Sequence, residues 1–163
     1  MAKIMISDDI FSPNESIIIN YTGSNTFRVC QIVRPLMEKI MQVESKDIFE
    51  RVFKWDILEE NRAFVNFWTT KKEEDKWTGV LIKFVIQGRQ HAQTKKGNVR
   101  IEISGYLETS YEYSNPFQLA FWKVYNKMFY YKRRRQYLER GREYAYAIRD
   151  EILKEMKIPR EAA

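Results

Sequence analysis

Residues 115–157 read NPFQLAFWKVYNKMFYYKRRRQYLERGREYAYAIRDEILKEMK, and this stretch decides the fold class. Asn115 offers a side-chain acceptor at a helix start, and Pro116 suits the first helical position because its missing N–H has no partner there in any case. Apolar side chains then recur every three or four residues, which is the spacing of one helix face: Phe117, Phe121, Val124, Met128 and Tyr131. Pro159 ends the pattern, because the residue before a proline is pushed out of helical conformation. The sequence therefore predicts one long C-terminal helix over about residues 116–157.

A helix of this length does not fit inside a compact domain. It would be about 60 Å long, because each residue rises about 1.5 Å, whereas a domain of this size has a radius of gyration of only about 15 Å. The helix must project, pair with another chain or break, and Gly141 is the expected break because glycine is a poor helix former. Leu138, Ala145 and Ile152 repeat every seven residues. We expect this row to pack on the body of the protein or on a second copy in a homodimer.

The basic excess of the chain lies on this helix. From Lys123 to Arg160 there are 12 Lys and Arg against 5 Asp and Glu, whereas residues 1–122 carry 16 of each kind. One interpretation is that such a helix contacts nucleic-acid phosphates, an anionic membrane surface or an acidic protein face. The alternative is a solvated helix face on which arginine stems cover apolar groups. Eight basic residues, three of them in or beside the polar loop 88–97, are the candidates for contact with nucleic acid or an acidic partner: Lys132, Arg133, Arg134, Arg135, Arg142, Arg89, Lys95 and Lys96.

The chain before the helix is rich in strand patterns. Apolar and polar residues alternate most clearly over residues 98–113, as in a strand with one wet face. Strands are expected at residues 3–6, 16–22, 47–57, 62–70, 77–87 and 98–113, and a helix with a kink or break at Pro35 is expected at residues 27–41. Short polar links between successive strands indicate hairpins. The sequence thus predicts a single α+β domain over residues 1–163, in which an antiparallel meander packs against the long C-terminal helix.

This order of elements, over most of the chain, resembles the helix-grip fold of START-like proteins, in which a curved sheet wraps the last helix. The resemblance implies an apolar cavity between sheet and helix that binds a lipid-like or aromatic small molecule. Six apolar side chains are the candidates for lining such a pocket: Phe53, Trp55, Phe67, Leu107, Phe121 and Trp122. The alternative is that these side chains simply fill the core.

The sequence contains no pattern that is typical of a catalytic or metal site. His91 is the only histidine and Cys30 the only cysteine, so no Cys or His cluster has metal-ligand spacing. Glycine-rich phosphate loops and the Gly-x-Ser-x-Gly elbow are absent. Cys30 lies on the apolar face of the helix at residues 27–41 and is expected to be a buried structural thiol. We therefore expect a protein that is not an enzyme and that uses no metal or cofactor.

Two functional interpretations remain open at this stage. The first is a non-catalytic binding protein with an apolar pocket for a small hydrophobic ligand. The second is an interaction protein whose basic helix docks on nucleic acid or a nucleoprotein assembly. The single cysteine and an N-terminus without the apolar core of a signal peptide favour a cytoplasmic location, and no stretch approaches the 18 apolar residues or so of a transmembrane span.

Overall fold

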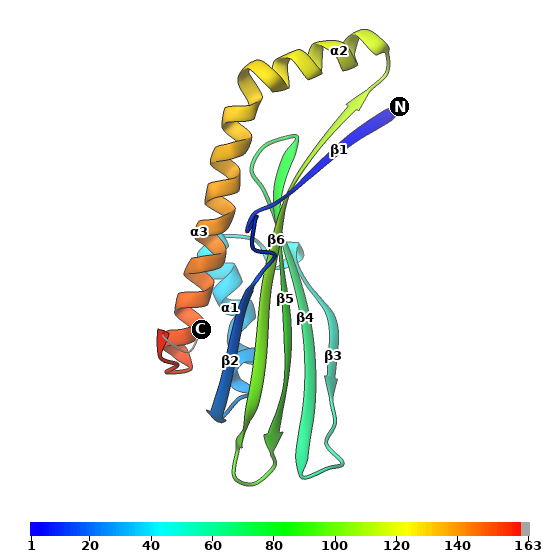
Figure 1. Cartoon of the computed structure of the whole chain (residues 1–163). Coiled ribbons are helices and arrows are strands. Elements are labelled where there is room, and N and C mark those ends of the chain that lie inside the picture. The colour runs from blue at the N-terminus through cyan, green and yellow to red at the C-terminus, as the bar shows by residue number, and fades with distance from the viewer. Residues whose placement is uncertain (161–163) are drawn as a thin grey trace.

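The computed structural model describes residues 1–160 and is an α+β fold, as the sequence predicts (Figure 1). Its strands are β1 (Ala2–Asp9), β2 (Ile17–Ser24), β3 (Ile48–Trp55), β4 (Asn61–Glu73), β5 (Thr78–His91) and β6 (Lys96–Tyr113). Its helices are α1 (Arg28–Met41), α2 (Pro116–Tyr125) and α3 (Tyr131–Glu155), with a 3-10 turn η1 (Ser45–Asp47) and a π-helical segment η2 (Asn126–Tyr130). No helix among the described residues is both long and apolar enough to cross a membrane.

The six strands form one antiparallel sheet in the order β1-β6-β5-β4-β3. The long strand β6 carries two partners on its outer side, because β1 pairs with its second half and β2 with its first half. The chain crosses between them at Ile10, whose N–H donates to the Gly105 carbonyl at 3.1 Å. The meander from β3 to β6 is therefore confirmed, and β1 and β2 extend it.

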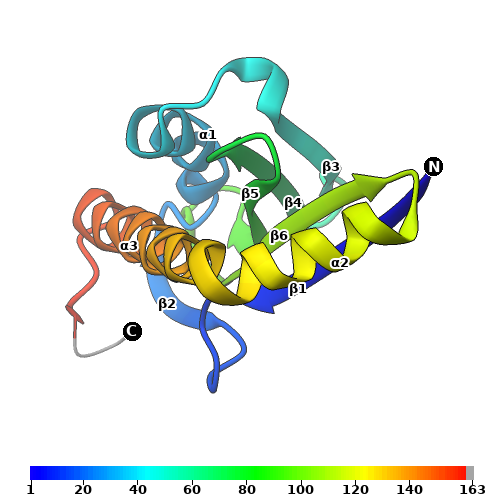
Figure 2. The ribbon, with the colours of Figure 1, turned by 90° about the horizontal axis from the view of Figure 1, so that it is seen from above.

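One face of the sheet carries the core. Alternate residues of β5 and β6 are fully buried there, among them the cross-strand pair Phe84 and Ile103. Helices α1 and α3 cover this face side by side (Figure 2). The opposite face is open to solvent, as the exposed side chains of Lys83, Gln87 and Arg100 show. Helix α1 runs unbroken through Pro35, so the two separate helices that the sequence allowed do not form.

The helix does not break at Gly141, so that prediction is wrong. Gly141 is buried in the middle of α3, and a Cβ placed on it would lie 3.2 Å from Cγ1 of Val80 and 3.4 Å from Cγ2 of Ile10. A side chain there would have to displace these neighbours by a few tenths of an ångström, so glycine suits the close approach of the helix to the sheet. Of the seven-residue row, Ala145 and Ile152 are fully buried in the core of this chain, and Leu138 packs against that core half-buried.

The long helix changes direction at η2 instead. A π-helical turn inserts extra backbone into an α-helix and is a recognised cause of a kink. Beyond this turn, α2 leaves the axis of α3 and runs out alongside the ends of β1 and β6 (Figures 1 and 2). The helix thus both projects and bends, and the bend decides which residues are left in solvent.

Candidate functional site

The most unusual surface of the molecule is the helical arm, by which we mean residues 116–135: α2, η2 and the first turn of α3. Trp122 is the only buried residue of α2, at 3 % exposure. The start of the arm is fixed by Asn115, whose side chain accepts a hydrogen bond from the Gln118 N–H at 2.8 Å. This is the cap that the sequence predicts. A well-formed helix therefore stands mostly in solvent.

Aromatic rings fasten the arm to the sheet. Trp122 stacks on Tyr111 of β6, with ring centroids 5.0 Å apart. Tyr130 in η2 is 1 % exposed and meets Trp77, next to the start of β5, edge to face at 5.2 Å. Such pairs add to the free energy of simple burial. These two contacts fix one side of the arm and leave its other side free.

A polar network below the bend completes the attachment. The Tyr130 hydroxyl lies 2.5 Å from Oγ1 of Thr78 and donates to the Asp75 carboxylate, 2.8 Å from its Oδ2. Thr78 also lies 2.9 Å from Thr109 on β6, and Thr109 accepts from Nε of Arg134 at 3.0 Å. The network joins the π-helical turn to two neighbouring strands, so the bend is held by specific bonds.

Asp75 is the charged centre of this network. Partial burial on its own would raise the pKa of Asp75, but hydrogen bonds from the Trp77 N–H, the Tyr130 hydroxyl and the Thr78 N–H outweigh burial and lower the pKa overall. A carboxylate that accepts several hydrogen bonds is favoured in its ionised form. Asp75 is therefore ionised at neutral pH and stabilises the turn that receives Tyr130.

We expect the Asp75→Asn variant to be destabilised most at neutral pH. Because the folded-state pKa lies below the unfolded value of about 4, ionised Asp75 stabilises the fold above that pH, and this contribution is lost as the pH falls through the folded-state pKa. Urea unfolding should separate variant and wild type at about pH 7, and the difference should shrink progressively as the pH falls below about 4. A difference that stays constant over this range would exclude the ionised carboxylate as its cause.

The apolar row predicted from the sequence points away from the core. Its members are exposed by 86 % at Phe117, 76 % at Phe121, 56 % at Val124, 62 % at Met128 and 56 % at Tyr131, and Phe129 beside it is 64 % exposed. We call these six residues the exposed apolar row. The sequence predicted five of them as one helix face and expected Phe121 to line a pocket between sheet and helix, whereas Phe121 lies in solvent.

The cause is the helical phase. The buried row of α3 runs back through Tyr137, Arg134 and Tyr130, and further steps of four residues reach Asn126 and then the buried Trp122 rather than Phe121. The apolar row of the arm and the buried row of α3 are thus on different sides of one helix. The buried row includes Arg134, which no apolar pattern singles out, so sequence reasoning missed this mismatch.

Cations accompany the exposed apolar row, and the arm itself contains no carboxylate. Between Glu112 and Glu139 the sequence has no Asp or Glu. Exposed cations lie throughout this stretch: Lys123, Lys127, Lys132, Arg133 and Arg135. Arg134 differs from them, because it is buried and pairs with Asp8 of β1. The arm therefore presents apolar and positive groups together.

The eight predicted basic contacts separate into three groups. Lys132, Arg133 and Arg135 are exposed on the arm. Arg134 and Arg142 are used inside the fold, where Arg142 donates to the Ile10 carbonyl. These two arginines hold β1 and the segment after it against α3, so they are not free to contact a partner.

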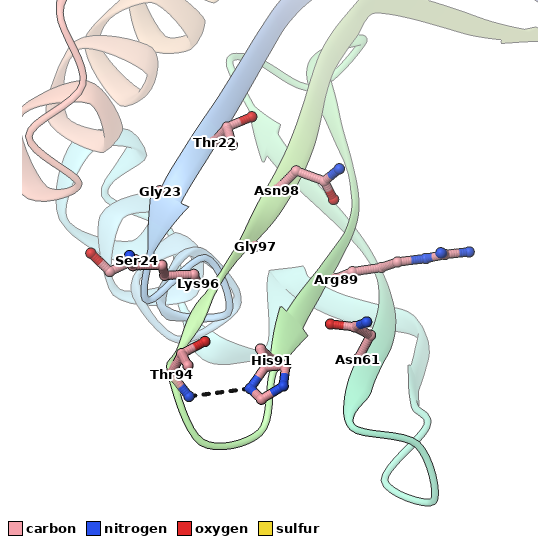
Figure 3. Close-up of a pocket in the computed structure, with 10 residues that line it drawn as sticks. All are labelled: Thr22, Gly23, Ser24, Asn61, Arg89, His91, Thr94, Lys96, Gly97 and Asn98. Atoms are coloured by element: carbon pink, nitrogen blue, oxygen red, sulfur yellow. Dashed lines mark hydrogen bonds between the residues drawn. The ribbon is translucent and has the colours of Figure 1, made fainter.

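The other three predicted basic residues, Arg89, Lys95 and Lys96, lie at the far end of the sheet. Arg89 and Lys96 line an open groove of about 590 Å³ at the tip of the β5–β6 hairpin (Figure 3). Lys95 sits in the hairpin turn with a φ of 60°. This tip is separated from the arm by the length of β6, up to about 55 Å at 3.3 Å per residue. The hairpin and the arm therefore do not form a single basic patch.

His91 takes part in a hairpin turn, and Cys30 is buried in the core. In the β5–β6 hairpin, Nδ1 of His91 accepts from the Gln93 and Thr94 N–H groups, each at 3.2 Å (Figure 3). Cys30 is 7 % exposed, and burial raises the pKa of its thiol to about 12. Within residues 1–160, no three His, Cys, Asp or Glu side chains are grouped to hold a metal ion.

The six predicted pocket residues do not meet around one cavity. Phe53 and Trp55 are 48 % and 37 % exposed on the edge strand β3, where Trp55 stacks on Phe27 at 4.2 Å. Phe67 is half-buried on β4, and Leu107 is buried in the core. Phe121 and Trp122 belong to the arm, one exposed and one buried.

The hollow nearest to the expected pocket lies between β1 and α3 and measures about 540 Å³. Leu107 contributes to its lining, but so do charged side chains from both elements, including Asp8, Asp9 and Arg135. A polar lining of this kind does not suit a hydrophobic ligand.

Comparison with known proteins adds little. No protein-family model matches the chain, and no curated protein matches it. Among solved structures, the protein of unknown function SA2116 from Staphylococcus aureus aligns over 97 % of this chain and 98 % of its own, with 9 % sequence identity and a TM-score of 0.29. No fold or function is inferred from a similarity of that size.

Proposed function

We propose that this protein is a non-catalytic docking protein that binds an anionic partner surface through its helical arm. The observation that carries the proposal is the exposed apolar row, which includes Phe117 at 86 % and Phe121 at 76 % exposure, on a stretch that has cations but no carboxylate. Contiguous exposed apolar surface on a soluble fold marks an interaction site. The charge around it selects partners of negative charge.

The way in which the arm is attached supports this proposal. Trp122 and Tyr130 fix one side of the arm through ring contacts and hydrogen bonds, so the helix is pre-formed and needs little ordering when it binds. Pre-organisation of this kind lowers the entropic cost of association. The interpretation as a carrier of a small hydrophobic ligand has less support, because its candidate residues are dispersed and the nearest hollow is polar.

The proposal is tested with charge variants against two classes of anionic partner. The arm variant carries Lys123→Gln, Lys127→Gln and Arg133→Gln and leaves the buried Arg134 intact. Its matched control carries Arg89→Gln, Lys95→Gln and Lys96→Gln, which remove the same charge at the other end of the sheet. Binding of each protein to anionic lipid vesicles is followed by co-sedimentation, and binding to single-stranded and double-stranded RNA by fluorescence anisotropy.

We expect wild type to bind at least one of these partners, and the arm variant to bind it at least about tenfold more weakly, since each cation near an anionic surface contributes about 1 kcal/mol. The control should retain most of the affinity. Equal losses in both variants would show that net charge alone is responsible, and failure of wild type to bind any of the partners would refute the proposal.

A further inference from the structure

We infer that the anionic partner is the surface of a lipid bilayer, into which the exposed apolar row inserts while the flanking cations reach the lipid headgroups. This inference rests on the proposed docking function of the arm. It names the partner from the kinds of side chain that the arm exposes and from their placement.

The composition of the row suits hydrocarbon better than nucleic-acid bases. Single-stranded nucleic acid is bound by flat rings on which bases stack. Four of the six members of the row carry rings, but Val124 and Met128 between them are 56 % and 62 % exposed and have none, so the row is not a continuous stacking surface. Fluid acyl chains accommodate inserted side chains of different shapes and need no complementary pocket. A bilayer therefore suits a row that mixes aliphatic and aromatic side chains.

The cations are placed as an interfacial helix needs them. Lys123 and Lys127 are exposed and lie one helical turn apart, and helix geometry places both beside the row rather than within it. Lysine stems lie along apolar surface while the ammonium groups extend to the polar layer. Helices with phenylalanine on one side and lysine or arginine beside it lie in the plane of anionic membranes.

The same charges argue against a second copy of this chain as the occupant. Two arms packed face to face would bring their exposed lysines and arginines together, and neither arm has an Asp or Glu between Glu112 and Glu139 to compensate them. Like charges placed opposite one another oppose association. Complementarity in charge therefore favours an anionic surface over a homodimer.

The fold also sets the orientation of the bound protein relative to the membrane. The arm lies at one end of the sheet, and the β5–β6 hairpin with its groove lies at the other (Figure 1). An arm lying in the interface places Phe117 and Phe121 in the bilayer and keeps the hairpin groove in water.

The test removes apolar side chains from either end of the molecule. The arm variant carries Phe117→Ser and Phe121→Ser, and the matched control carries Ile57→Ser and Leu58→Ser, which are 61 % and 93 % exposed in the β3–β4 connection. Full-length proteins are co-sedimented with phosphatidylcholine vesicles with and without phosphatidylserine. Circular dichroism and thermal unfolding check that each variant is folded. We expect both variants to fold, because all four substituted side chains are exposed.

We expect wild type and control to bind the phosphatidylserine vesicles alike, and the arm variant to bind about 100-fold more weakly, since two phenylalanines leave the interface. Vesicles without phosphatidylserine should bind wild type at least about tenfold more weakly. Arm-dependent binding to RNA without binding to vesicles, or an arm-dependent dimer in sedimentation velocity, would overturn the membrane inference. The RNA result would leave the docking function standing, whereas absence of binding to either partner would refute both.

Discussion

The Tyr130→Ala variant is expected to lower the free energy of unfolding by about 4 kcal/mol, because truncating a fully buried ring removes its burial and leaves a cavity. Tyr130 is 1 % exposed. Its ring makes two aromatic contacts, to Trp77 and Tyr125, and its hydroxyl bonds to Thr78 and Asp75. Loss of its hydroxyl also leaves Thr78 and Asp75 with fewer partners, and an unsatisfied buried polar group costs about 1–3 kcal/mol.

Urea unfolding of Tyr130→Ala and Tyr130→Phe separates these two effects. Tyr130→Phe keeps the ring and loses only the hydroxyl, so it should cost about 1–2 kcal/mol. A neighbouring exposed residue provides the matched control, and Phe129→Ala should change stability by less than about 0.5 kcal/mol. If Tyr130→Ala were as mild as Phe129→Ala, Tyr130 would not be the anchor of the arm.

The Gly141→Leu variant is expected to lower the free energy of unfolding by about 3 kcal/mol. A Cβ at this position already lies 3.2 Å from Cγ1 of Val80, and a leucine adds three further carbon atoms in the same narrow space between α3 and the sheet. Overpacking of a core costs about 1–3 kcal/mol and occasionally more. The better helix propensity of leucine returns less than about 1 kcal/mol.

Chemical denaturation measures this effect, with Glu139→Leu as the control on the exposed side of α3. Glu139→Leu should be close to neutral, because the side chain at this position is exposed. A Gly141→Leu protein as stable as wild type would mean that α3 does not approach β5 as closely as the structure has it.

The fold class could be predicted because its signals are local. The alternation of apolar and polar residues predicted β6, and the cap at Asn115 and Pro116 predicted the start of α2. The short polar links between strands predicted their antiparallel order. The break at Gly141 was predicted wrongly because helix propensity is a weak guide. A glycine that weakens an isolated helix is here selected by the close packing of α3 on Val80 and Ile10.

The candidate site was harder to predict, because it depends on which side of the helix meets the sheet. The row from Phe117 to Tyr131 has the spacing of a buried face, and spacing alone does not distinguish a face that meets the core from one that meets a partner. The π-helical turn and the pairing of Tyr130 with Asp75, which is 55 residues away in sequence, are tertiary features. The roles of Arg134 and Arg142 depend likewise on contacts with the N-terminal strand region.

One measurement tests the central claim most directly. A fluorophore whose emission reports polarity is attached to a cysteine introduced at Val124, in the exposed apolar row, or at Thr94, in the distant hairpin. Cys30 stays unlabelled in the folded protein, because it is buried. On addition of phosphatidylserine vesicles, the label at position 124 should brighten and shift to shorter wavelength, while the label at position 94 should not change. No change at position 124, or equal changes at both positions, would contradict docking of the arm in the membrane.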